Sequence, residues 1–585
     1  MNTLCHLIPT FKNRNSANPA IQYKIENQWI KLSWKDYSNQ IIKIANGLTN
    51  LGVKKNSKVV LISNTRWEWS AIDFAVMGLQ AQIIPVYQNC SLEELEYILD
   101  NCEAEFLIVE NKNVLRSFYS IQSRLKKSPQ LISIETCENT ILLSDLMKQE
   151  VCPDYIQFFE KSCLSTLPEN ILTIIYTSGT TGTPKGVVLT HEAAYSEVSE
   201  AFTYCGADAS DVSLSFLPYA HILGRIESWG HAYIGFTMAY AENIEKVRTN
   251  LSEIKPTILI SVPRIFEKIY AMVKTQVVGS KLQRQVFDWA INVGLKVGDL
   301  RIKKLPVSLS LALEYEVARQ LVLSKVKDAF GGNLRFAISG GAPLNNEISL
   351  FFHACEILIL EGYGLTETTA AITVNTPFDY RFGSVGKPIG ETQIKIADDG
   401  EVLVKSKKVM KEYFKLPEET KNVFTDGWFH TGDIGEILSS GDLKITDRKK
   451  DLIKTAGGKY VAPQKIEGLL KLYPWISNVL IHGDQRKYIV ALIALDKNYI
   501  LEYAEEKQIV YSDYEGLTQH PTILNLVKQS IIDTNSQLAS FESIKRYAVL
   551  SAEFSIEEGD LTPSLKVKRK YLDKKWAPLL DSLYA

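Results

Sequence analysis

Residues 176–187 read YTSGTTGTPKGV and follow the short apolar run 171–175. The β-branched residues of that run indicate a buried strand. A loop of hydroxyl residues and glycines with one lysine suits a polyphosphate, because glycines admit close backbone N–H groups, hydroxyls donate hydrogen bonds and Lys185 supplies a positive charge. The loop is not of the Walker A type, since Lys185 follows Pro184 and precedes Gly186 rather than Ser or Thr. The alternative interpretation, a solvated turn, is disfavoured by so specific a string.

Bulk properties narrow the class of protein. A chain of 585 residues is too long for one core, so two or more domains are expected. Its net charge of −2 gives no reason to expect a nucleic-acid partner. The eight cysteines are scattered without Cys-x-x-Cys spacing, which disfavours metal and redox motifs and favours a reducing compartment. No signal-peptide pattern is present, and no apolar run reaches the roughly 18 residues that a membrane-spanning helix needs. We expect a cytoplasmic protein, and peripheral contact with a membrane stays open.

Alternating periodicities predict an α/β organisation. Ser33 begins a helical pattern that Gly52 ends, and a strand follows over 58–62. Helical and strand patterns continue to alternate to about residue 375, which predicts parallel sheets with helices on both faces. Helical periodicity dominates about 264–330. From about 382 the pattern changes to short strands separated by turns, which predicts a small β-rich subdomain.

Five further motifs follow the glycine-rich loop in order. They are Gly340–Pro343 (GGAP), Glu361–Thr368 (EGYGLTET), Thr431–Asp433 (TGD), Asp447–Lys454 (DRKKDLIK) and Leu561–Arg569 (LTPSLKVKR). Together with the loop they resemble the AMP-forming adenylate synthetases, the superfamily of acyl-CoA synthetases, luciferases and peptide-synthetase adenylation domains. The resemblance spans roughly residues 20–575. It implies an AMP-binding N-terminal domain over 1–449, with the β-rich subdomain at about 382–447, and a small mobile α+β C-terminal domain over 450–585.

The resemblance assigns a phosphate and metal site. The family's loop holds the β- and γ-phosphates of ATP, and it corresponds here to Thr177, Ser178, Gly179, Thr180, Thr181 and Lys185. Glu367 matches the acidic ligand of Mg²⁺, and Thr177 matches its hydroxyl neighbour. Thr366 matches the contact to the α-phosphate. The alternative for Glu367 is a carboxylate that caps a helix N-terminus.

The same resemblance assigns a nucleoside site. Tyr363, between Gly362 and Gly364, matches the aromatic residue that stacks on adenine, and such stacking contributes about 1–3 kcal/mol. The opposite wall of the purine site corresponds to Gly341, Ala342 and Pro343. Asp433 matches the carboxylate that binds both ribose hydroxyls, and Arg448 reaches the same sugar and phosphate. The alternative for Tyr363 is a tyrosine of the hydrophobic core. The alternative for Asp433 and Arg448 is a surface ion pair.

Catalysis is implied for residues near and beyond a hinge at Lys450. Lys566 matches the lysine that bridges the substrate carboxylate and the α-phosphate during adenylation, although Leu565 replaces the glycine that often precedes it. The surrounding basic run would otherwise be a solvated face. Lys454, Gly457 and Gly458 match a loop that enters the site when CoA attacks the adenylate. The alternative for these glycines is a plain turn.

Three segments favour one branch of the family. The segments 217–221 (LPYAH), 262–269 (VPRIFEKI) and 457–463 (GGKYVAP) are similar to long-chain fatty acyl-CoA synthetases. His221 then lines the acyl entrance, with a buried structural histidine as the alternative. The branch often has Glu-Arg after this histidine segment, whereas this chain has Gly224-Arg225, which leaves the acyl length open.

The sequence therefore predicts a long-chain fatty acid–CoA ligase that uses ATP, Mg²⁺ and CoA. The closest alternative is a fatty acyl-AMP ligase that passes the acyl group to a carrier protein. Such ligases usually carry an insertion near the domain junction, and none is evident over 450–464. A luciferase-like oxygenase and a non-catalytic binding protein are more distant alternatives. Whether the protein forms a homodimer is left open.

Overall fold

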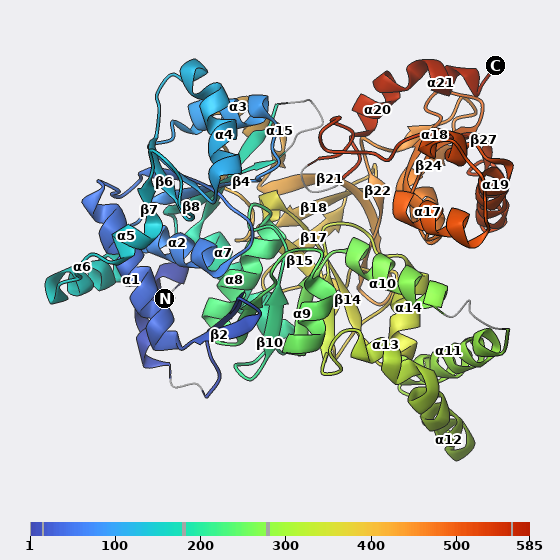
Figure 1. The fold of residues 1–585 in the computed structure, drawn as a ribbon, viewed down its shortest axis with the longest axis horizontal. Helices are drawn as coiled ribbons and strands as arrows, with labels where there is room; N and C mark the ends of the chain where they lie inside the picture. The colour runs from blue at the N-terminus through green and yellow to red at the C-terminus, as the bar shows by residue number, and fades with distance from the viewer. Residues whose placement is uncertain (1, 15–16, 178–182, 277–280, 563–565) are drawn as a thin grey trace.

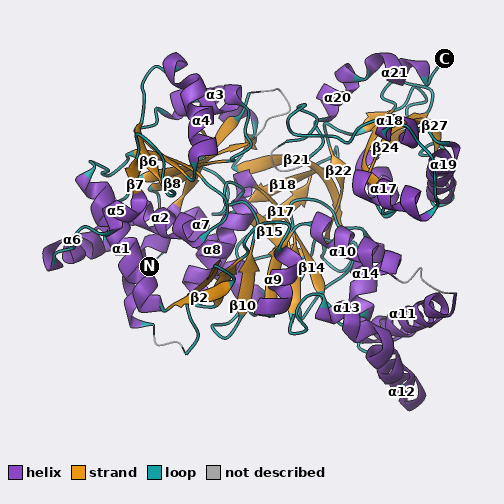
Figure 2. Cartoon of the chain, in the orientation of Figure 1, coloured by secondary structure: helices purple, strands orange, loops and turns teal. Residues whose placement is uncertain are grey.

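The computed structural model describes residues 2–14, 17–177, 183–276, 281–562 and 566–585. A large body is followed by a smaller C-terminal unit, orange to red, that lies beside it (Figure 1). The strands gather at the centre of the body, and helices lie outside them (Figure 2). This α/β architecture confirms the fold class expected from the alternating periodicities.

The first sheet of the body holds the strand before the glycine-rich loop. Its order is β19 (Glu412–Tyr413), β9 (Lys185–Thr190), β8 (Ile171–Thr177), β4 (Gln82–Val86), β3 (Lys58–Ile62), β5 (Phe106–Val109), β6 (Gln130–Ser133) and β7 (Ile141–Leu142). The strands from β8 to β7 run parallel, whereas β9 and β19 add antiparallel pairs at one edge. The almost continuous apolar runs of β3, β4 and β5 fit this arrangement, because parallel strands are covered on both faces.

The second sheet holds the strand of the EGYGLTET motif. Its order is β16 (Lys387–Pro388), β15 (Ala370–Val374), β14 (Ile359–Leu365), β13 (Phe336–Ser339), β12 (Ile258–Ser261), β10 (Val212–Ser215), β11 (Thr237–Tyr240), β1 (Ile21–Ile25) and β2 (Gln28–Leu32). The strands from β14 to β1 are parallel, and both edges are antiparallel.

The expected β-rich subdomain is a separate antiparallel sheet. It consists of β17 (Gln393–Ile396), β18 (Glu401–Lys405), β21 (Trp428–Ile437), β20 (Phe424–Thr425) and β22 (Leu443–Arg448). Gly400 and Gly441 occupy left-handed backbone at φ +85° in the turns before β18 and β22. Both turns carry the Asp-Gly or Gly-Asp signals that the sequence displays.

The C-terminal unit has a sheet of its own. The strands β25 (Ile476–His482), β26 (Ile489–Leu495) and β27 (Ile544–Val549) form it, and β23 (Ile453–Lys454) pairs with β24 (Tyr460–Val461) in a hairpin. Strand β26 is buried along its whole length because apolar clusters cover both faces of the sheet. The domain boundary after residue 449 stays a prediction.

The helices complete the layers. In the body they are η1 (Leu4–Asn13), α1 (Trp34–Asn50), α2 (Trp67–Gly78), α3 (Leu92–Cys102), α4 (Lys112–Ile121), α5 (Leu143–Met147), α6 (Pro153–Leu164), α7 (His191–Tyr204), α8 (Ile222–Ile234), α9 (Val247–Ile254), α10 (Pro263–Gln276), α11 (Lys281–Ile302), α12 (Leu309–Ala318), α13 (Ser324–Asp328), α14 (Asn346–Ala354) and α15 (Pro417–Asn422). In the C-terminal unit they are α16 (Pro463–Leu470), α17 (Lys497–Glu506), α18 (Tyr514–Thr518), α19 (Pro521–Asn535), α20 (Arg569–Lys575) and α21 (Ala577–Ser582). Among the helices of the described ranges, none has the length and apolar character needed to cross a membrane.

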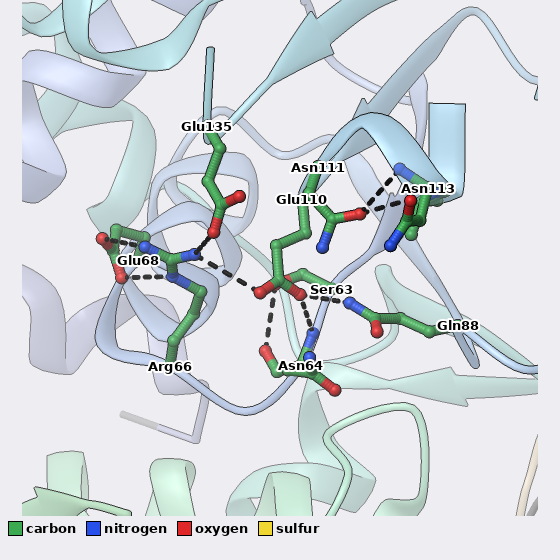
Figure 3. A network of polar contacts seen from close by, with 10 residues as sticks. Ser63, Asn64, Arg66, Glu68, Gln88, Glu110, Asn111, Asn113 and Glu135 are labelled. Atoms are coloured by element: carbon green, nitrogen blue, oxygen red, sulfur yellow. Dashed lines mark hydrogen bonds and ion pairs between the residues drawn. The ribbon is translucent and has the colours of Figure 1, made fainter. Parts of the chain in front are cut away.

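A polar network ties together the loops that leave the parallel strands of the first sheet (Figure 3). Glu110, after β5, accepts hydrogen bonds from the backbone N–H of Asn64, 2.6 Å away, and from the side chain of Gln88. Arg66 connects Glu110 to Glu68 and Glu135. The neighbouring Thr65 hydroxyl donates to the carbonyl of Leu217 at 2.6 Å. The network therefore fixes the strand ends and anchors the segment that leads to His221.

A fully buried ion pair joins α2 to α8. Asp73 accepts two hydrogen bonds from Arg225, at 2.6 and 3.0 Å, and a third from the indole of Trp229. Arg225 also donates to the Thr173 hydroxyl on β8 at 2.6 Å. Arg225, which follows the departure from the family at Gly224, thus holds α8 against β8, the strand that leads to the glycine-rich loop.

We predict that Asp73→Ala lowers the free energy of unfolding by about 3–5 kcal/mol, because it leaves the Arg225 charge buried without a partner. The double variant Asp73→Ala/Arg225→Met should recover part of that loss. Urea denaturation followed by tryptophan fluorescence measures both. Lys148→Ala, which breaks the exposed pair with Asp145, serves as the control and should cost less than about 1 kcal/mol. A double variant less stable than Asp73→Ala would contradict the prediction.

Candidate active site

The EGYGLTET motif runs along β14, between β15 and β13 of the second sheet, and into a short 3-10 turn, η5 (Thr366–Thr368). Strand β14 pairs with β15 through Gly362–Val374 and Tyr363–Thr373, and the register shifts after Tyr363. A side chain at Gly364 would place its Cβ atom 1.4 Å from the carbonyl oxygen of Ala370. Glycine is therefore required at this position by the close approach of the next strand.

Asp433 is the buried centre of a charged cluster. Its carboxylate accepts a hydrogen bond from the Tyr363 hydroxyl at 2.7 Å and lies 3.3 Å from Nε of Arg448. Asp433 and Arg448 face each other as partners in the ladder between β21 and β22. Burial raises the pKa of Asp433, while Arg448 and Tyr363 act to lower it. The structure thus brings together, from two different sheets, three residues that are predicted to bind the nucleoside.

Glu367 lies in a second cluster with Tyr413. The Tyr413 hydroxyl donates to the Glu367 carboxylate at 2.9 Å, and burial raises the pKa of Tyr413, which keeps it a donor. Lys185 lies over the Tyr413 ring at 5.2 Å from its centre and pairs with Glu419. Tyr413 and Glu419 were missed by the sequence prediction. Only the pairing of β19 with β9 brings Tyr413 here, and no local spacing signals it.

Thr177 and Lys185 are partners at the open end of the β8–β9 ladder. The Thr177 hydroxyl is 3.5 Å from the carbonyl oxygen of Lys185. The intervening predicted residues Ser178, Gly179, Thr180 and Thr181 lie outside the described residues. The two ends of the predicted phosphate loop are nevertheless adjacent, and Thr366 precedes Glu367 in the neighbouring turn.

The loop after β13 lies against the motif strand. The backbone N–H of Leu344 donates to the Glu361 carboxylate at 3.1 Å, and Gly341 adopts left-handed backbone at φ +81°. Ala342 and Pro343 lie between these two positions. Burial raises the pKa of Glu361 to about 7. Glu361, a part of the motif without a predicted role, is therefore the side chain that holds the GGAP loop beside Gly362.

Lys566 comes from the C-terminal unit and faces these clusters. Its backbone N–H donates to the Thr562 hydroxyl at 3.0 Å, and its carbonyl accepts from the Thr562 N–H at 2.8 Å. Although Lys566 retains exposed surface, desolvation and then the positive charge of Arg448 lower its pKa to about 8, while the negative charges of Asp433 and Glu367 raise it. The ammonium therefore lies within the field of the carboxylates at the motif strands.

His221 caps the N-terminus of α8. Its Nδ1 accepts a hydrogen bond from the backbone N–H of Leu223 at 3.2 Å, so the proton of the neutral ring is on Nε2. Burial lowers the pKa of His221 to about 3, and the positive charge of Lys566 contributes. His221 is thus a neutral donor within electrostatic reach of Lys566. Both the structural and the substrate-binding interpretation are compatible with this position.

The predicted CoA loop lies in the β23–β24 hairpin. The backbone N–H of Lys454 donates to Asp484 at 3.0 Å, and Gly458 adopts φ +76° between the strands. Added Cβ atoms at Gly457 and Gly458 would meet at most one atom, Oγ1 of Thr455 at 4.0 Å from Gly457. The contacts described for Lys454 and Gly457 lie within the C-terminal unit, so the structure does not unite this loop with the nucleotide motifs.

Lys450 lies in the turn between the two parts of the chain. Lys449 is held on the β-rich sheet by Asp399 at 2.6 Å and Glu401 at 2.9 Å. The turn closes through the N–H of Asp451 and the carbonyl of Arg448 at 2.9 Å. Arg264 adds a contact between the parts, donating to the carbonyl of Ser477 at 3.3 Å. The predicted hinge therefore follows directly on a firmly held strand end.

The protein side chains at this site provide too few ligands for Mg²⁺, so the phosphates of a substrate would have to complete its coordination shell. In the described part of the chain, no group of three or more His, Cys, Asp or Glu side chains could hold a metal by itself. Mg²⁺ commonly takes one or two protein carboxylates and completes its shell with phosphates and water. A single carboxylate at Glu367, beside the ends of the phosphate loop, fits that pattern.

Comparisons with known proteins show the family of the chain. Residues 10–414 match the family described as AMP-binding enzyme, and residues 450–585 match the AMP-binding enzyme C-terminal domain. The chain is 33% identical over 567 residues to the long-chain-fatty-acid--CoA ligase FadD15 of Mycobacterium bovis, covering 96% of this chain and 94% of the relative. It is 30% identical over 599 residues to the peroxisomal long chain acyl-CoA synthetase 7 of Arabidopsis thaliana, covering 94% and 82%.

Solved structures show the same fold. The adenylation domain of a carboxylate reductase from Mycobacterium chelonae superposes with a TM-score of 0.77 at 20% identity, covering 100% of this chain and 91% of that domain. A fatty acyl CoA synthetase from Mycobacterium tuberculosis gives a TM-score of 0.62 at 23% identity, covering 99% of both chains. The matched family spans most of the chain, and the sequence relatives span nearly all of it. The chain therefore belongs to the AMP-binding enzyme family.

Proposed function

We propose that this protein is an AMP-forming long-chain fatty acid–CoA ligase. It converts a fatty acid and ATP to acyl-AMP and pyrophosphate, and then transfers the acyl group to CoA with release of AMP. The observation that carries the proposal is the cluster in which Asp433 accepts from the Tyr363 hydroxyl at 2.7 Å and lies 3.3 Å from Arg448, with the charge of Lys566 from the C-terminal unit acting on the same carboxylate. The relatives named as long-chain fatty acid–CoA ligases support the same reaction.

In the first step an oxygen of the fatty acid carboxylate attacks the α-phosphorus, and the bond to the pyrophosphate oxygen breaks. Two anions must approach, so positive charge and hydrogen-bond donors are needed where they meet. Lys566 supplies the charge between carboxylate and α-phosphate, and Thr366 supplies a hydroxyl. In this proposal the neutral His221, with its proton on Nε2, donates to the carboxylate at the acyl entrance.

The nucleoside is held by the first cluster. Asp433 binds the ribose hydroxyls, and Arg448 offsets its charge and reaches the phosphate. Adenine lies between Tyr363, bounded by Gly362 and Gly364, and the loop of Gly341, Ala342 and Pro343. The hydrogen bond from Tyr363 to Asp433 couples the base site to the sugar site, because one side chain serves both.

The phosphates are held by Lys185 together with the loop 177–181. Glu367 and Thr177 would hold Mg²⁺, which supplies positive charge to the phosphates when bound. Tyr413 orients the Glu367 carboxylate through its 2.9 Å hydrogen bond. Because Tyr413 also lies beneath Lys185, it sets the spacing between the carboxylate and the lysine.

The second step requires the C-terminal unit, residues 450–585, to turn about Lys450. The loop of Lys454, Gly457 and Gly458 would then replace Lys566 at the site and guide the CoA thiol to the acyl carbonyl, with AMP as leaving group. Lys449 stays bound to the β-rich sheet, so the rotation is confined to the residues that follow it.

A fatty acyl-AMP ligase that loads a carrier protein is not favoured. The relatives from Mycobacterium bovis and Arabidopsis thaliana are named as a CoA ligase and an acyl-CoA synthetase, and this chain covers most of the length of each. We place the enzyme in the cytoplasm, and the free state of all eight cysteines fits a reducing compartment.

The test is a pyrophosphate-release assay over acids from acetate to very long chains, with and without CoA. We expect release with long-chain acids, strict dependence on ATP, and acyl-CoA as the product when CoA is present. Release without any thioester after addition of CoA would contradict the CoA ligase and favour the carrier-protein ligase.

The rotation of the C-terminal unit can be tested separately from adenylation by a substitution in its loop. Gly457 has free space for a side chain in this arrangement, so Gly457→Val should preserve folding and acyl-AMP formation. If the loop enters a narrow site with CoA, the added side chain should slow thioester formation at least about tenfold. Single-turnover assays that follow acyl-AMP and acyl-CoA separately measure both steps.

Gly468→Ala is the matched control, because Gly468 also has free space and lies outside the loop. It should leave both steps unchanged. Thioester formation by Gly457→Val at the wild-type rate would mean that this loop does not approach the acyl-AMP.

A further inference from the structure

Helices α11 and α12 form a hairpin that projects from the body at the lower right of the view (Figure 1). The inner face of α11 is held tightly on α14. A Cβ atom at Gly294 would come within 2.7 Å of the carbonyl oxygen of Ala354, and the Phe287 ring lies 6.3 Å from that of Phe351. Helix α14 leads directly into the motif strand β14. The hairpin is therefore a rigid extension of the domain that carries the active site.

Helix α12 packs on α11 with one face only. Tyr315 and Ala318 are buried, and the Tyr315 hydroxyl donates to Glu356 at 3.1 Å. The opposite face of α12, together with the loop before it and the π-helical turn η4 (Arg319–Leu323) after it, carries apolar residues every four positions, which places them along one side. This leucine stripe consists of Leu305, Leu309, Leu313, Val317 and Leu321, exposed by 52, 86, 71, 51 and 50%.

Isolated exposed apolar residues are ordinary on protein surfaces, but a continuous row on a projecting element is not. The described packing of α12 does not require leucine at these positions, because its buried residues lie on the other side. Leu309 and Leu313, with the largest exposed fractions, are in the helix itself, and Leu305 is in the loop at the hairpin tip. The stripe therefore indicates a surface that binds a partner.

The charge of the hairpin indicates the kind of partner. The hairpin, residues 281–318, contains six lysines or arginines and four acidic residues, a net charge of +2, whereas the whole chain has a net charge of −2. Lys303 and Lys304 precede the stripe in the connection between α11 and α12. Lys303 pairs with Asp299, and Arg319 pairs with Glu316, in exposed ion pairs. Such pairs are weak, so these side chains can turn to other anions.

We propose that the leucine stripe docks on the surface of a bilayer that contains anionic lipids. The helix lies in the plane of the interface, its leucines enter the boundary between headgroups and acyl chains, and the flanking lysines and arginines bind the phosphates. A second copy of the chain fits less well, because two copies would bring two basic hairpins together. The docking does not depend on the proposed function, but a ligase docked there would meet long-chain acids where they dissolve.

The test is flotation of the whole protein with vesicles of phosphatidylcholine, with and without phosphatidylglycerol. We expect binding to the anionic vesicles that weakens at high salt. Leu309→Gln/Leu313→Gln should lower the partition coefficient at least about tenfold, because two apolar side chains no longer enter the interface. Lys303→Glu/Lys304→Glu should lower binding to anionic vesicles selectively.

Leu164→Gln/Leu167→Gln is the matched control, since both residues are 52% exposed on the body and lie outside the hairpin. It should bind vesicles like the wild type. Thermal melting checks that every variant is folded, and no substrate is present, so the readout is separate from the ligase assay. Absence of wild-type binding, or equal binding by the two leucine variants, would overturn the proposal. So would a solution dimer that Leu309→Gln/Leu313→Gln dissociates without affecting vesicle binding.

Discussion

The buried carboxylate of Asp433 is the interaction on which the arrangement of the molecule depends. Three groups from three parts of the chain converge on it: the Tyr363 hydroxyl from the second sheet, the Arg448 guanidinium from the end of the β-rich sheet, and the Lys566 charge from the C-terminal unit. A buried carboxylate is costly unless its charge is compensated. The positive charge of Lys566 acts to lower the pKa of Asp433, so the C-terminal unit contributes to this compensation.

The electrostatics of Lys566 follow from this convergence. Its pKa is lowered to about 8 because desolvation and Arg448 outweigh the two carboxylates. The charged form of a desolvated lysine is stabilised when a further negative charge binds beside it. The α-phosphate and the substrate carboxylate would supply such charges. In the proposed mechanism the site is thus short of negative charge before substrates bind and balanced after they bind. The product adenylate carries less charge than the ATP it replaces, which weakens the hold on Lys566 and favours departure of the C-terminal unit.

Much of this could be predicted from the sequence, for local reasons. The strand at 58–62 and the helix from Ser33 to Gly52 have strong periodicity and clear caps, so their observed bounds agree closely with the prediction. The proposed site residues come in compact motifs, each of which lies on one strand end or one turn. Glu361 and Gly364 lie inside such a motif, but their roles depend on neighbouring strands and are visible only in the structure.

Other features depend on distant contacts that no local pattern reveals. Tyr413 meets Glu367 only because β19 adds to the edge of the first sheet. Arg225 lies beside the departure from the family pattern at Gly224, and its pairing with Asp73 needs the packing of α8 on α2. The leucine stripe has helical spacing, yet the sequence does not tell which side of α12 faces solvent. These features depend on contacts between distant segments, which local periodicity does not encode.

In the proposed mechanism Lys566 serves adenylation alone. Lys566→Ala should be assayed in the two half-reactions separately, with acyl-AMP formed from fatty acid and ATP, and acyl-CoA formed from supplied acyl-AMP. Lys568→Ala, which removes a neighbouring positive charge in the same basic run, is the control. We predict that Lys566→Ala slows the first half-reaction about 10²–10³-fold and leaves the second nearly unchanged, because one charge-stabilising donor is lost from one transition state only. An equal loss in both half-reactions would contradict the account.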